Sequence, residues 1–226
     1  MNLEKIALQI ENCEQCPRLR SHCRKIAEEK RRQFREETYW GKPVPGFGDP
    51  DARLLIVGLA PAAHGANRTG RMFTGDQSGL WLFRAIHKAG FSNQAESTRR
   101  DDDLRLRGAF ITAIARCAPP QNKPSPSEIK SCSQYLRAEM ECLAKVQVFL
   151  ALGRMALRGL WEVLPEHARG AEKIPEFRHG GQIRLADGRM IFCSYHPSQQ
   201  NTFTKKLTEP MFDKVFLEVK KFLQSR

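Results

Sequence analysis

Four side chains of different types stand out because together they could bind a planar ligand and act on it: Phe73, Asp76, Asn122 and His196. A carboxylate and an imidazole can move or stabilise charge, an amide is both donor and acceptor, and an aromatic ring can stack on another ring. Each residue also has an ordinary explanation. Asp76 could cap a helix that begins near Ser78, Phe73 could pack in a core, and the other two could belong to proline-containing turns. A functional interpretation requires the fold to bring all four together.

The pattern of apolar residues predicts how these side chains are positioned. Continuous apolar runs are typical of buried parallel strands, and four occur: Leu54–Val57, Ala109–Ile114, Val146–Leu152 and Met190–Tyr195. Apolar residues at helical spacing alternate with them, in Ser78–Ala89, Ser127–Leu143, Gly153–Leu164 and Leu207–Leu223. Alternating strands and helices predict an α/β fold with a parallel sheet. Because ligands bind beyond the carboxyl ends of such strands, the candidate residues, which follow three of the runs, should meet there.

The segments outside these elements are predicted more coarsely. Ser127, which follows two prolines, is expected to be the N-cap of the second helix. The polar stretches Ser92–Arg107 and Pro165–Gly181 are expected to be surface loops. The charged stretch Arg18–Glu37 is interpreted as a solvated helix face, with contact to phosphates as the alternative.

The cysteines suggest a metal centre. There are seven, an odd number that disfavours a framework of disulfides in a chain without a secretory signal. Cys13 and Cys16 have the C-x-x-C spacing, and Cys117 and Cys132 could complete a site of four thiolates. Zinc and an iron–sulphur cluster both accept four thiolates, and a set of buried, reduced cysteines is the remaining alternative. Of the other three, Cys142 and Cys193 are expected to pack in the core, and Cys23 has no assigned role.

Length and charge limit the number of domains and the kinds of partner that the chain could have. The chain has 226 residues, enough for one domain with a sizeable core, and we expect a single domain over residues 1–226. Lys and Arg number 37 against 25 Asp and Glu, a net charge of +12, which makes a polyanion such as nucleic acid a candidate partner. No apolar run approaches the roughly 20 residues of a membrane span, and the charged N-terminus is unlike a signal peptide, so we expect a cytoplasmic protein.

Taken together, the motifs resemble the type-5 uracil-DNA glycosylases of the uracil-DNA glycosylase superfamily. The motifs that carry this resemblance are Cys13-x-x-Cys16-Pro17-Arg18-Leu19, Gly58-Leu59-Ala60-Pro61-Ala62 through Gly75-Asp76, Arg116-Cys117-Ala118-Pro119-Pro120-Gln121-Asn122-Lys123-Pro124, and His196-Pro197-Ser198 with Asn201. The resemblance implies a three-layer αβα sandwich with a four-stranded parallel sheet. It also implies a structural 4Fe–4S cluster on Cys13, Cys16, Cys117 and Cys132, the first two in an N-terminal ligating segment. The implied activity is the excision of uracil and other deaminated bases, such as hypoxanthine and xanthine, from double-stranded DNA by a nucleoid-associated monomer.

The resemblance also implies roles for the candidate residues. Phe73 would stack on the extruded base, and the amide of Asn122 would match the N3–H and O4 of uracil. His196 would hydrogen-bond the base near O2, where negative charge develops. Asp76 would stabilise the cationic sugar or orient the attacking water. Small residues such as Ala60 would leave the pocket open to purines as well as uracil.

Contacts to DNA are expected from four further residues: Arg71, Ser198, Asn201 and Lys205. The segment Ser198–Leu207 would enter the minor groove beside the extruded nucleotide. The chain differs from the family pattern at two places. Leu59 and Ala60 stand where most uracil-DNA glycosylases have an acidic or amide side chain, an absence shared by the type-5 group, and Lys205 stands where the group often has glycine. No lysine occupies a nucleophile motif, so a monofunctional enzyme without strand cleavage is expected.

Two other kinds of protein are compatible with parts of this pattern. A non-catalytic, metal-bearing nucleic-acid binder would need only the basic surface and the cysteines. A nucleotide-binding α/β enzyme would use Gly58–Gly70 as a phosphate loop, but that segment lacks the glycine and lysine spacing of such loops.

Overall fold

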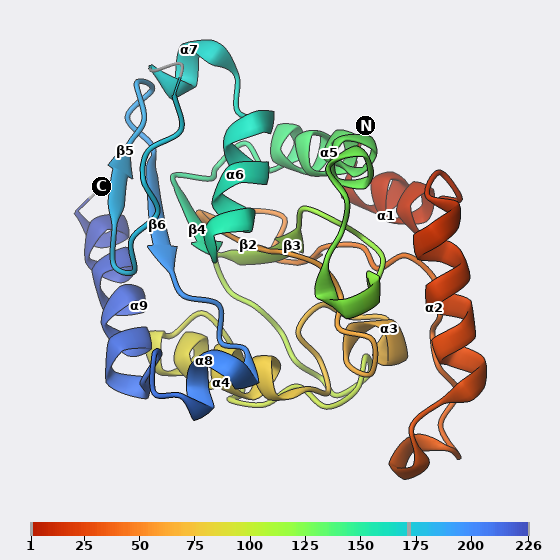
Figure 1. Ribbon diagram of the computed structural model, residues 1–226. Coiled ribbons are helices and arrows are strands. Elements are labelled where there is room, and N and C mark those ends of the chain that lie inside the picture. Colours follow the sequence, from red (N-terminus) through yellow and green to blue (C-terminus); the bar gives the residue numbers. More distant parts are fainter. Residues whose placement is uncertain (1, 171–172, 226) are drawn as a thin grey trace.

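A six-stranded mixed sheet forms the centre of the computed structural model, which describes residues 2–170 and 173–225 (Figure 1). Its strand order is β1-β3-β2-β4-β6-β5. The four central strands are parallel and correspond to the four predicted runs: β3 (Ala109–Ala113), β2 (Leu54–Gly58), β4 (Val148–Leu152) and β6 (Met190–Ser194). The predicted parallel α/β sheet is therefore confirmed, and two antiparallel edge strands extend it: β1 (Phe47–Gly48) and β5 (Gln182–Arg184).

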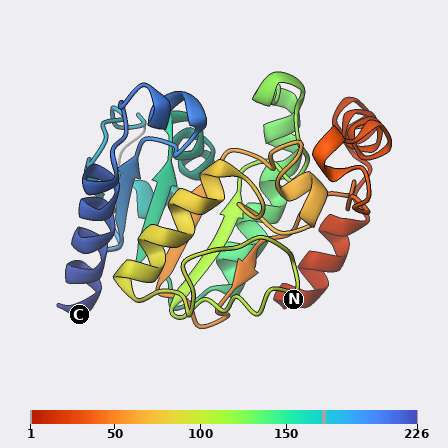
Figure 2. The same cartoon turned by 90° about the horizontal axis from the view of Figure 1, so that it is seen from below.

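Helices cover both faces of this sheet, which gives three layers (Figure 2). One face carries α4 (Gln77–Ala89) and α9 (Glu209–Gln224), which also contact each other. The opposite face carries α5 (Pro126–Cys142) and α6 (Arg154–Val163), and α1 (Leu3–Glu11) packs against α5. Four shorter or peripheral helices complete the described chain: α2 (Pro17–Glu29), α3 (Ala66–Thr69), α7 (Glu166–Arg169) and α8 (Gln199–Phe203).

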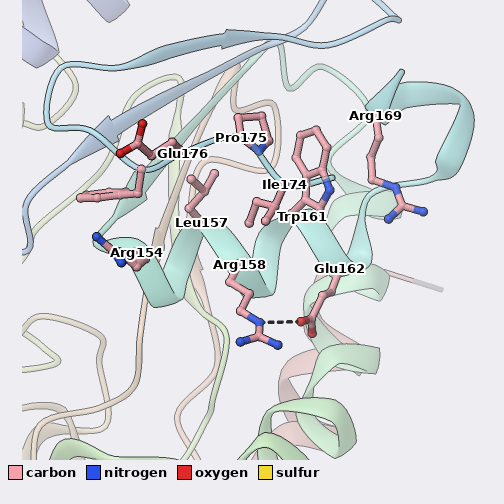
Figure 3. Close-up of a pocket in the computed structure, with 10 residues that line it drawn as sticks. Arg154, Leu157, Arg158, Trp161, Glu162, Arg169, Ile174, Pro175 and Glu176 are labelled. Atoms are coloured by element: carbon pink, nitrogen blue, oxygen red, sulfur yellow. Dashed lines mark hydrogen bonds and ion pairs between the residues drawn. The ribbon is translucent and has the colours of Figure 1, made fainter. Parts of the chain in front are cut away.

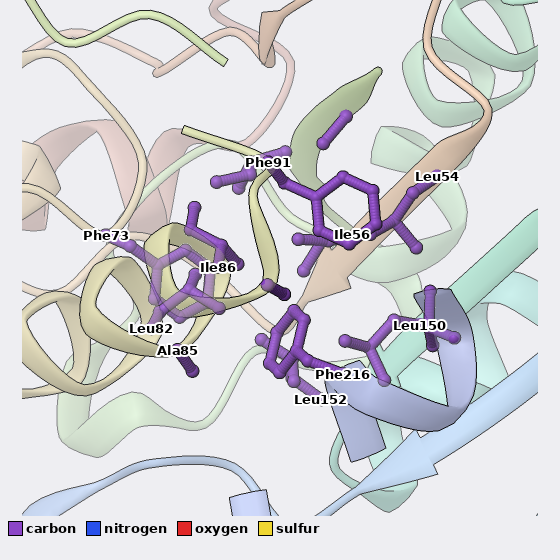
Figure 4. Close-up of a cluster of buried hydrophobic side chains, with 14 of the residues drawn as sticks. Leu54, Ile56, Phe73, Leu82, Ala85, Ile86, Phe91, Leu150, Leu152 and Phe216 are labelled. Atoms are coloured by element: carbon purple, nitrogen blue, oxygen red, sulfur yellow. The ribbon is translucent and has the colours of Figure 1, made fainter. Parts of the chain in front are cut away.

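Two hydrophobic cores, one on each face, hold the layers together. Successive strand residues point to opposite faces, so Leu54 and Ile56 of β2 enter one core while Leu55 and Val57 enter the other. The first core packs the strands against the apolar sides of α4 and α9, including Phe216 (Figure 4). Burial on both faces explains why the central strands are continuous apolar runs rather than alternating ones.

The order of the strands predicts a ligand crevice at the carboxyl end of β2. The helix that follows β2 lies on one face of the sheet, whereas the helices that follow its two neighbours, β3 and β4, lie on the other. The loops leaving these strands therefore diverge, which opens a crevice at such switch points in parallel sheets.

The structure corrects one predicted helix start and adds detail to the loops. The N-cap of α5 is Ser125, not Ser127: Ser125 Oγ accepts from the backbone N–H of Glu128 at 3.2 Å, and the Glu128 carboxylate accepts from the N–H of Ser125 at 2.7 Å. Pro126 then occupies the first helical position, where its missing N–H costs nothing. The stretch predicted as a loop at 165–181 contains the short helix α7, and residues 171–172 within it lie outside the described chain.

The predicted solvated face at residues 18–37 is only partly solvated. Helix α2 occupies most of it, and Arg20 on that helix is 4% exposed, with Nη1 donating to the carbonyl of Gly41 at 3.1 Å. In the described part of the chain, no helix is long and apolar enough to cross a membrane.

Candidate active site

Two predicted site residues stack on each other at the carboxyl end of the sheet. The rings of Phe73 and His196 have centroids 5.8 Å apart and planes 29° apart. Phe73 has a φ of +55° and is 9% exposed. Its ring lies against Gly58, the last residue of β2, so closely that a Cβ on that glycine would be 2.9 Å from Cε2 and Cζ. The loop after β2 thus places an aromatic ring beside the histidine that follows β6.

Asp76 caps the helix that follows this loop. Its Oδ1 accepts from the N–H of Gly79 at 2.9 Å, which satisfies a free donor of the first turn of α4. Two glycines make room for it: a Cβ on Gly65 would lie 2.0 Å from Oδ2, and a Cβ on Gly79 would lie 1.7 Å from the carbonyl oxygen of Phe73. Burial raises the pKa of Asp76, and the backbone N–H groups of Gly79 and Ser78 only partly oppose this. The ordinary capping explanation is therefore true of Asp76, and one carboxylate oxygen takes part in it.

His196 is held by residues that the sequence had suggested as DNA contacts. Asn201 Nδ2 donates to the carbonyl oxygen of His196 at 2.8 Å, and Ser198 caps α8 by accepting from the N–H of Asn201 at 3.4 Å. Burial lowers the pKa of His196 to about 4, so its imidazole is neutral near pH 7. Ser198 and Asn201 thus position the histidine loop, whatever further contacts they make.

The remaining pocket residues are less constrained. Asn122 lies in the turn Pro120–Asn122 after β3, with a φ of +57°, and its side chain is exposed. No hydrogen bond joins its amide to another of the described residues, so both ends of the amide are available to a ligand. Ala60 follows β2 and is partly exposed; the N–H of Ala115 donates to the neighbouring carbonyl of Leu59 at 3.0 Å and fixes this loop to the one after β3.

The four predicted cysteine ligands come from separate elements and converge between α1, α2, β3 and α5. Cys13 and Cys132 pack around Ile6, Ile10 and Tyr135, while Cys16 packs near Cys117. Burial raises the pKa of the Cys16 thiol, and Cys117, Glu128 and Cys13 raise it further. Burial likewise raises the pKa of Cys132 to about 12, with smaller contributions from Cys117 and Cys13. Each thiol is thus close enough to influence its neighbours, although in residues 2–170 and 173–225 no three such side chains are arranged to hold a single metal ion.

Comparison with known proteins identifies the family. The family model of the Uracil DNA glycosylase superfamily matches residues 45–220. The chain belongs to the uracil-DNA glycosylase superfamily. A type-5 uracil-DNA glycosylase of Thermus thermophilus is 47% identical over 221 residues, which is 98% of this chain and 98% of the relative. A type-5 enzyme of Pyrobaculum aerophilum is 44% identical over 197 residues (87% and 83%), whereas a type-4 enzyme of that organism is 30% identical over 201 residues (88% and 84%).

These relatives place the glycosylase in the type-5 group, so the resemblance predicted from the motifs is confirmed, as is the enzyme class, hydrolysis of N-glycosyl bonds. The alternative of a non-catalytic metal-bearing protein loses its support, because the family match covers the loops that carry Phe73, Asp76, Asn122 and His196.

One expected DNA contact of the glycosylase is instead part of its interior. The side chain of Arg71 is 7% exposed and pairs with the carboxylate of Asp102. Its guanidinium also donates to Ser97 Oγ at 2.7 Å and to the carbonyl oxygens of Arg99 and Arg100 at 2.6 and 3.0 Å. Arg71 therefore fastens the loop at 92–107 to the loop that carries Phe73, and a phosphate cannot reach its guanidinium without displacing these partners.

The segment 198–207 exposes an apolar side chain next to two lysines. Phe203, at the end of α8, is 71% exposed, and Lys205 and Lys206 are exposed beside it. Lys206 lies over the ring of Tyr195 with Nζ 4.9 Å from the centroid, which fixes the segment to the end of β6. Lys205 has a φ of +56°, in the left-handed region that glycine adopts without strain.

Two residues behind the site were missed by the sequence analysis. Arg68 is buried, and its guanidinium donates to the carbonyl oxygens of His64 at 2.9 Å and Gly75 at 3.0 Å. His64 Nδ1 lies 3.1 Å from the hydroxyl of Tyr39. Together they fix both ends of the loop that ends at Asp76. Neither Arg68 nor His64 carries a signal in the sequence for this role, because their partners are backbone carbonyls and a distant tyrosine.

A fifth cysteine and an arginine adjoin the four predicted ligands. Cys23 was left unassigned, but its Sγ is 3.6 Å from the carbonyl oxygen of Ala118 and it hydrogen-bonds Cys117. Arg116 is 1% exposed, its Nη2 pairs with Glu139 at 2.6 Å, and its Nε and Nη1 have no hydrogen-bond partner among the described residues. Its positive charge lowers the pKa of Cys132, against the stronger effect of burial. Buried thiols beside a cation with unused donors fit an anionic four-thiolate group.

A separate groove lies on the outer side of α6, with a volume of about 500 Å³ (Figure 3). Its walls include Trp161 from that helix and the extended segment with Ile174, Pro175 and Glu176. None of the predicted site residues lines it. The groove is therefore distinct from the crevice at the carboxyl ends of the strands.

Proposed function

We propose that this glycosylase hydrolyses the N-glycosyl bond between uracil and deoxyribose in double-stranded DNA, as a monofunctional enzyme of base excision repair. The observation that carries the proposal is the stack of Phe73 on His196 at the end of β2, with Asp76 three residues further along the chain. The full-length similarity to type-5 uracil-DNA glycosylases supports it.

Recognition begins with extrusion of the target nucleotide, because the bond to be broken is inaccessible inside a duplex. The base then enters the crevice, where the ring of Phe73 supplies a stacking face. The exposed amide of Asn122 is free to pair with N3–H and O4 of uracil. Cytosine presents the opposite pattern of donor and acceptor at these positions, so the same amide orientation would be mismatched.

Bond cleavage leaves negative charge on the base and positive charge on the sugar, and the two ionisable residues match this separation. His196 is neutral near pH 7, and the N–H of its neutral imidazole can donate a hydrogen bond to O2. The ionised carboxylate of Asp76 can stabilise the sugar cation or orient the water that attacks it, and both roles require the deprotonated form. Hydrogen bonds from Asn201 and from Gly79 keep the two groups in place.

Contact with the duplex is assigned to the segment 198–207. Phe203 is an exposed apolar side chain flanked by Lys205 and Lys206, a combination that suits insertion between bases with neighbouring phosphate contacts. Arg71 is not included, because its guanidinium is already bound inside the protein.

We further propose that Cys13, Cys16, Cys117 and Cys132 hold a 4Fe–4S cluster. The packing of Cys16 with Cys117 and of Cys13 with Cys132, beside the buried cation of Arg116, supports this proposal, because such clusters are held by four thiolates. The bound group would supply a cross-link between the N-terminal helices and the loop after β3. In the protein itself, the cation and the unused donors of Arg116 would stabilise its negative charge.

The acidity of Asp76 predicts the pH dependence of the reaction. Because burial raises its pKa, the carboxylate gains a proton at a higher pH than an ordinary aspartate does. The single-turnover rate should therefore rise with pH through this raised pKa and then level off, while His196 stays neutral down to about pH 4. Measuring the rate against pH for the wild type and for Asp76→Asn checks this. If the residual rate of the variant still rises with pH over the same range, the rise belongs to the titration of another group.

Small residues around the crevice predict a broad range of bases. Ala60, Ala62 and Ala63 are all partly exposed. A pocket with small apolar walls discriminates against a larger base by only about 1–3 kcal/mol of transition-state binding. Hypoxanthine should therefore be excised as well as uracil. Asn122→Ala should slow uracil more than hypoxanthine, which presents its groups to the amide in a different register. Ala62→Tyr should restrict the enzyme toward uracil.

Single-turnover rates of the wild type and both variants on uracil:guanine and hypoxanthine:thymine duplexes measure this range. Excision of uracil alone by the wild type would contradict the open-pocket argument. The basic proposal is tested more simply, by incubating the protein with a uracil-containing duplex and cleaving with alkali. Only a glycosylase leaves an abasic site, so an alkali-resistant strand would overturn it.

A further inference from the structure

A basic turn follows α2, and its side chains form no ion pair with the other residues that the structure describes. It consists of Lys30, Arg31, Arg32 and Arg35, grouped around the short 3-10 helix Arg32–Phe34. The three arginines are exposed, and in the described part of the chain no carboxylate pairs with any of the four cations. The ammonium of Lys30 instead donates to the carbonyl oxygen of Arg35 at 3.1 Å, which closes the turn. Four cations without an ion pair are thus held within six residues, between the glutamate pairs at 28–29 and 36–37.

The cations of the preceding helix differ in this respect. Arg24 pairs with Glu14 at 2.5 Å, and Lys25 pairs with Glu29 at 3.6 Å. These two residues of α2 are as exposed as the turn, but their charge is balanced by carboxylates of the protein. Among the cations of α2 and the turn, those that have no ion pair with another described residue therefore lie in the turn, where they can pair with the phosphates of a polyanion.

Specific contacts fasten the basic turn to the loop that carries Asp76. The guanidinium of Arg68 lies 3.9 Å from the ring centroid of Phe34 and also pairs with Glu37. The N–H of Arg31 donates to the hydroxyl of Tyr39 at 3.3 Å, and that hydroxyl contacts His64. Because Arg68 and His64 belong to the 59–76 loop, the turn has a fixed position relative to the active site.

The turn and the segment 198–207 flank the site from opposite sides. In Figure 1 the strands β4 and β6 point toward the lower edge of the molecule, where α8 lies at the left and the orange turn after α2 projects at the right. In the view from below, the blue helix α8 lies at the upper edge left of centre and the red-orange end of α2 lies at the right (Figure 2). A duplex whose nucleotide enters the crevice at the ends of the strands would extend toward both.

We propose that the basic turn binds backbone phosphates of the duplex at a distance from the extruded nucleotide, on the side away from residues 198–207. The choice of DNA as the partner depends on the proposed function. The four cations without an ion pair, their contrast with the paired cations of α2 and their fixed position beside the site carry the inference. Arginine suits this contact because its guanidinium donates two parallel hydrogen bonds to a phosphate.

The test compares two variants that remove the same amount of charge. In R31Q/R32Q the cations come from the basic turn, and in R24Q/K25Q they come from the paired positions of α2. Affinity for an undamaged duplex is measured over a range of salt concentrations, with melting temperatures as a check on folding. Each lost phosphate contact lowers the slope of log K against log salt by about 0.9, so the turn variant should lose about two units and the helix variant almost none.

An equal decrease of the salt-dependence slope in the two variants would show only the effect of net charge and would overturn the proposal. An unchanged slope for R31Q/R32Q would overturn it as well. Binding to undamaged duplex does not depend on catalysis, and uracil excision by the wild type is measured on the same preparation. A protein that fails to excise uracil but shows the difference in slopes would refute the proposed function while leaving the basic turn as a DNA contact.

Discussion

Replacing Asp76 by asparagine is expected to lower the single-turnover rate of uracil excision by at least about two orders of magnitude, the size found when a group that stabilises transition-state charge is removed. Asparagine keeps an oxygen that can accept from the N–H of Gly79 and is itself a good N-cap, so α4 should remain capped. Asp76→Ala removes both the charge and the cap. The two variants should therefore be similarly inactive, but only Asp76→Ala should lose stability.

His196→Ala is expected to have a rate effect of similar size, because it removes the group placed to stabilise charge on the departing base. Affinity for a uracil-containing duplex should change little in Asp76→Asn and His196→Ala, since both groups act mainly in the transition state. Asp187→Asn, which changes a partly exposed carboxylate paired with Arg189, serves as a charge control and should be fully active. Parallel losses of affinity and rate would instead make Asp76 and His196 binding residues.

Replacement of Cys132 or Cys16 by serine should have the largest effect on the protein itself. We expect the purified wild type to be brown, with absorption at about 400 nm from charge transfer between thiolate and iron. Either serine variant should lose this absorption and most of its iron, and its melting temperature should fall sharply. The reason is that the four thiols join α1, α2, α5 and the loop after β3, so losing the bound group releases the N-terminal helices.

Cys193→Ala provides the matched control for these variants. Cys193 is buried within β6 and has no role in the proposed cluster, so its replacement should leave the iron content and the colour unchanged. A colourless wild type with stoichiometric zinc would contradict the cluster, and retention of iron by Cys132→Ser would contradict the choice of ligand.

The elements that position the site were predictable because their physical signals are local. A strand buried on both faces must be apolar throughout, and all four central strands carry that signal within two residues of their observed bounds. The edge strands β1 and β5 lack it, because each is at most three residues long and not fully buried. The cap of α5 was misplaced by two residues because both Ser125 and Ser127 follow a proline. The spacing of Ser125 and Glu128, which is that of a capping box, is the signal in the sequence that distinguishes them.

The contacts of the candidate site residues were only partly predictable from the sequence. The meeting of Phe73 with His196 follows from parallel strand ends, so the sequence was sufficient for it. The burial of Arg71 was not, because it depends on Asp102 and on backbone carbonyls of an irregular loop. The same holds for Arg68, Cys23 and Arg116, whose partners come from segments that no pattern in the sequence connects.

The most direct measurement of the central claim is the identification of the products from a duplex with a single uracil:guanine pair. The wild type should release free uracil, detected by mass spectrometry, and leave a strand that stays intact until alkali breaks it at the abasic site. Asp76→Asn, tested at the same concentration, should release uracil at least about a hundred times more slowly. A strand cut without alkali, a released nucleotide in place of free uracil, or equal rates for the two proteins would contradict hydrolysis of the N-glycosyl bond with Asp76 as an essential group.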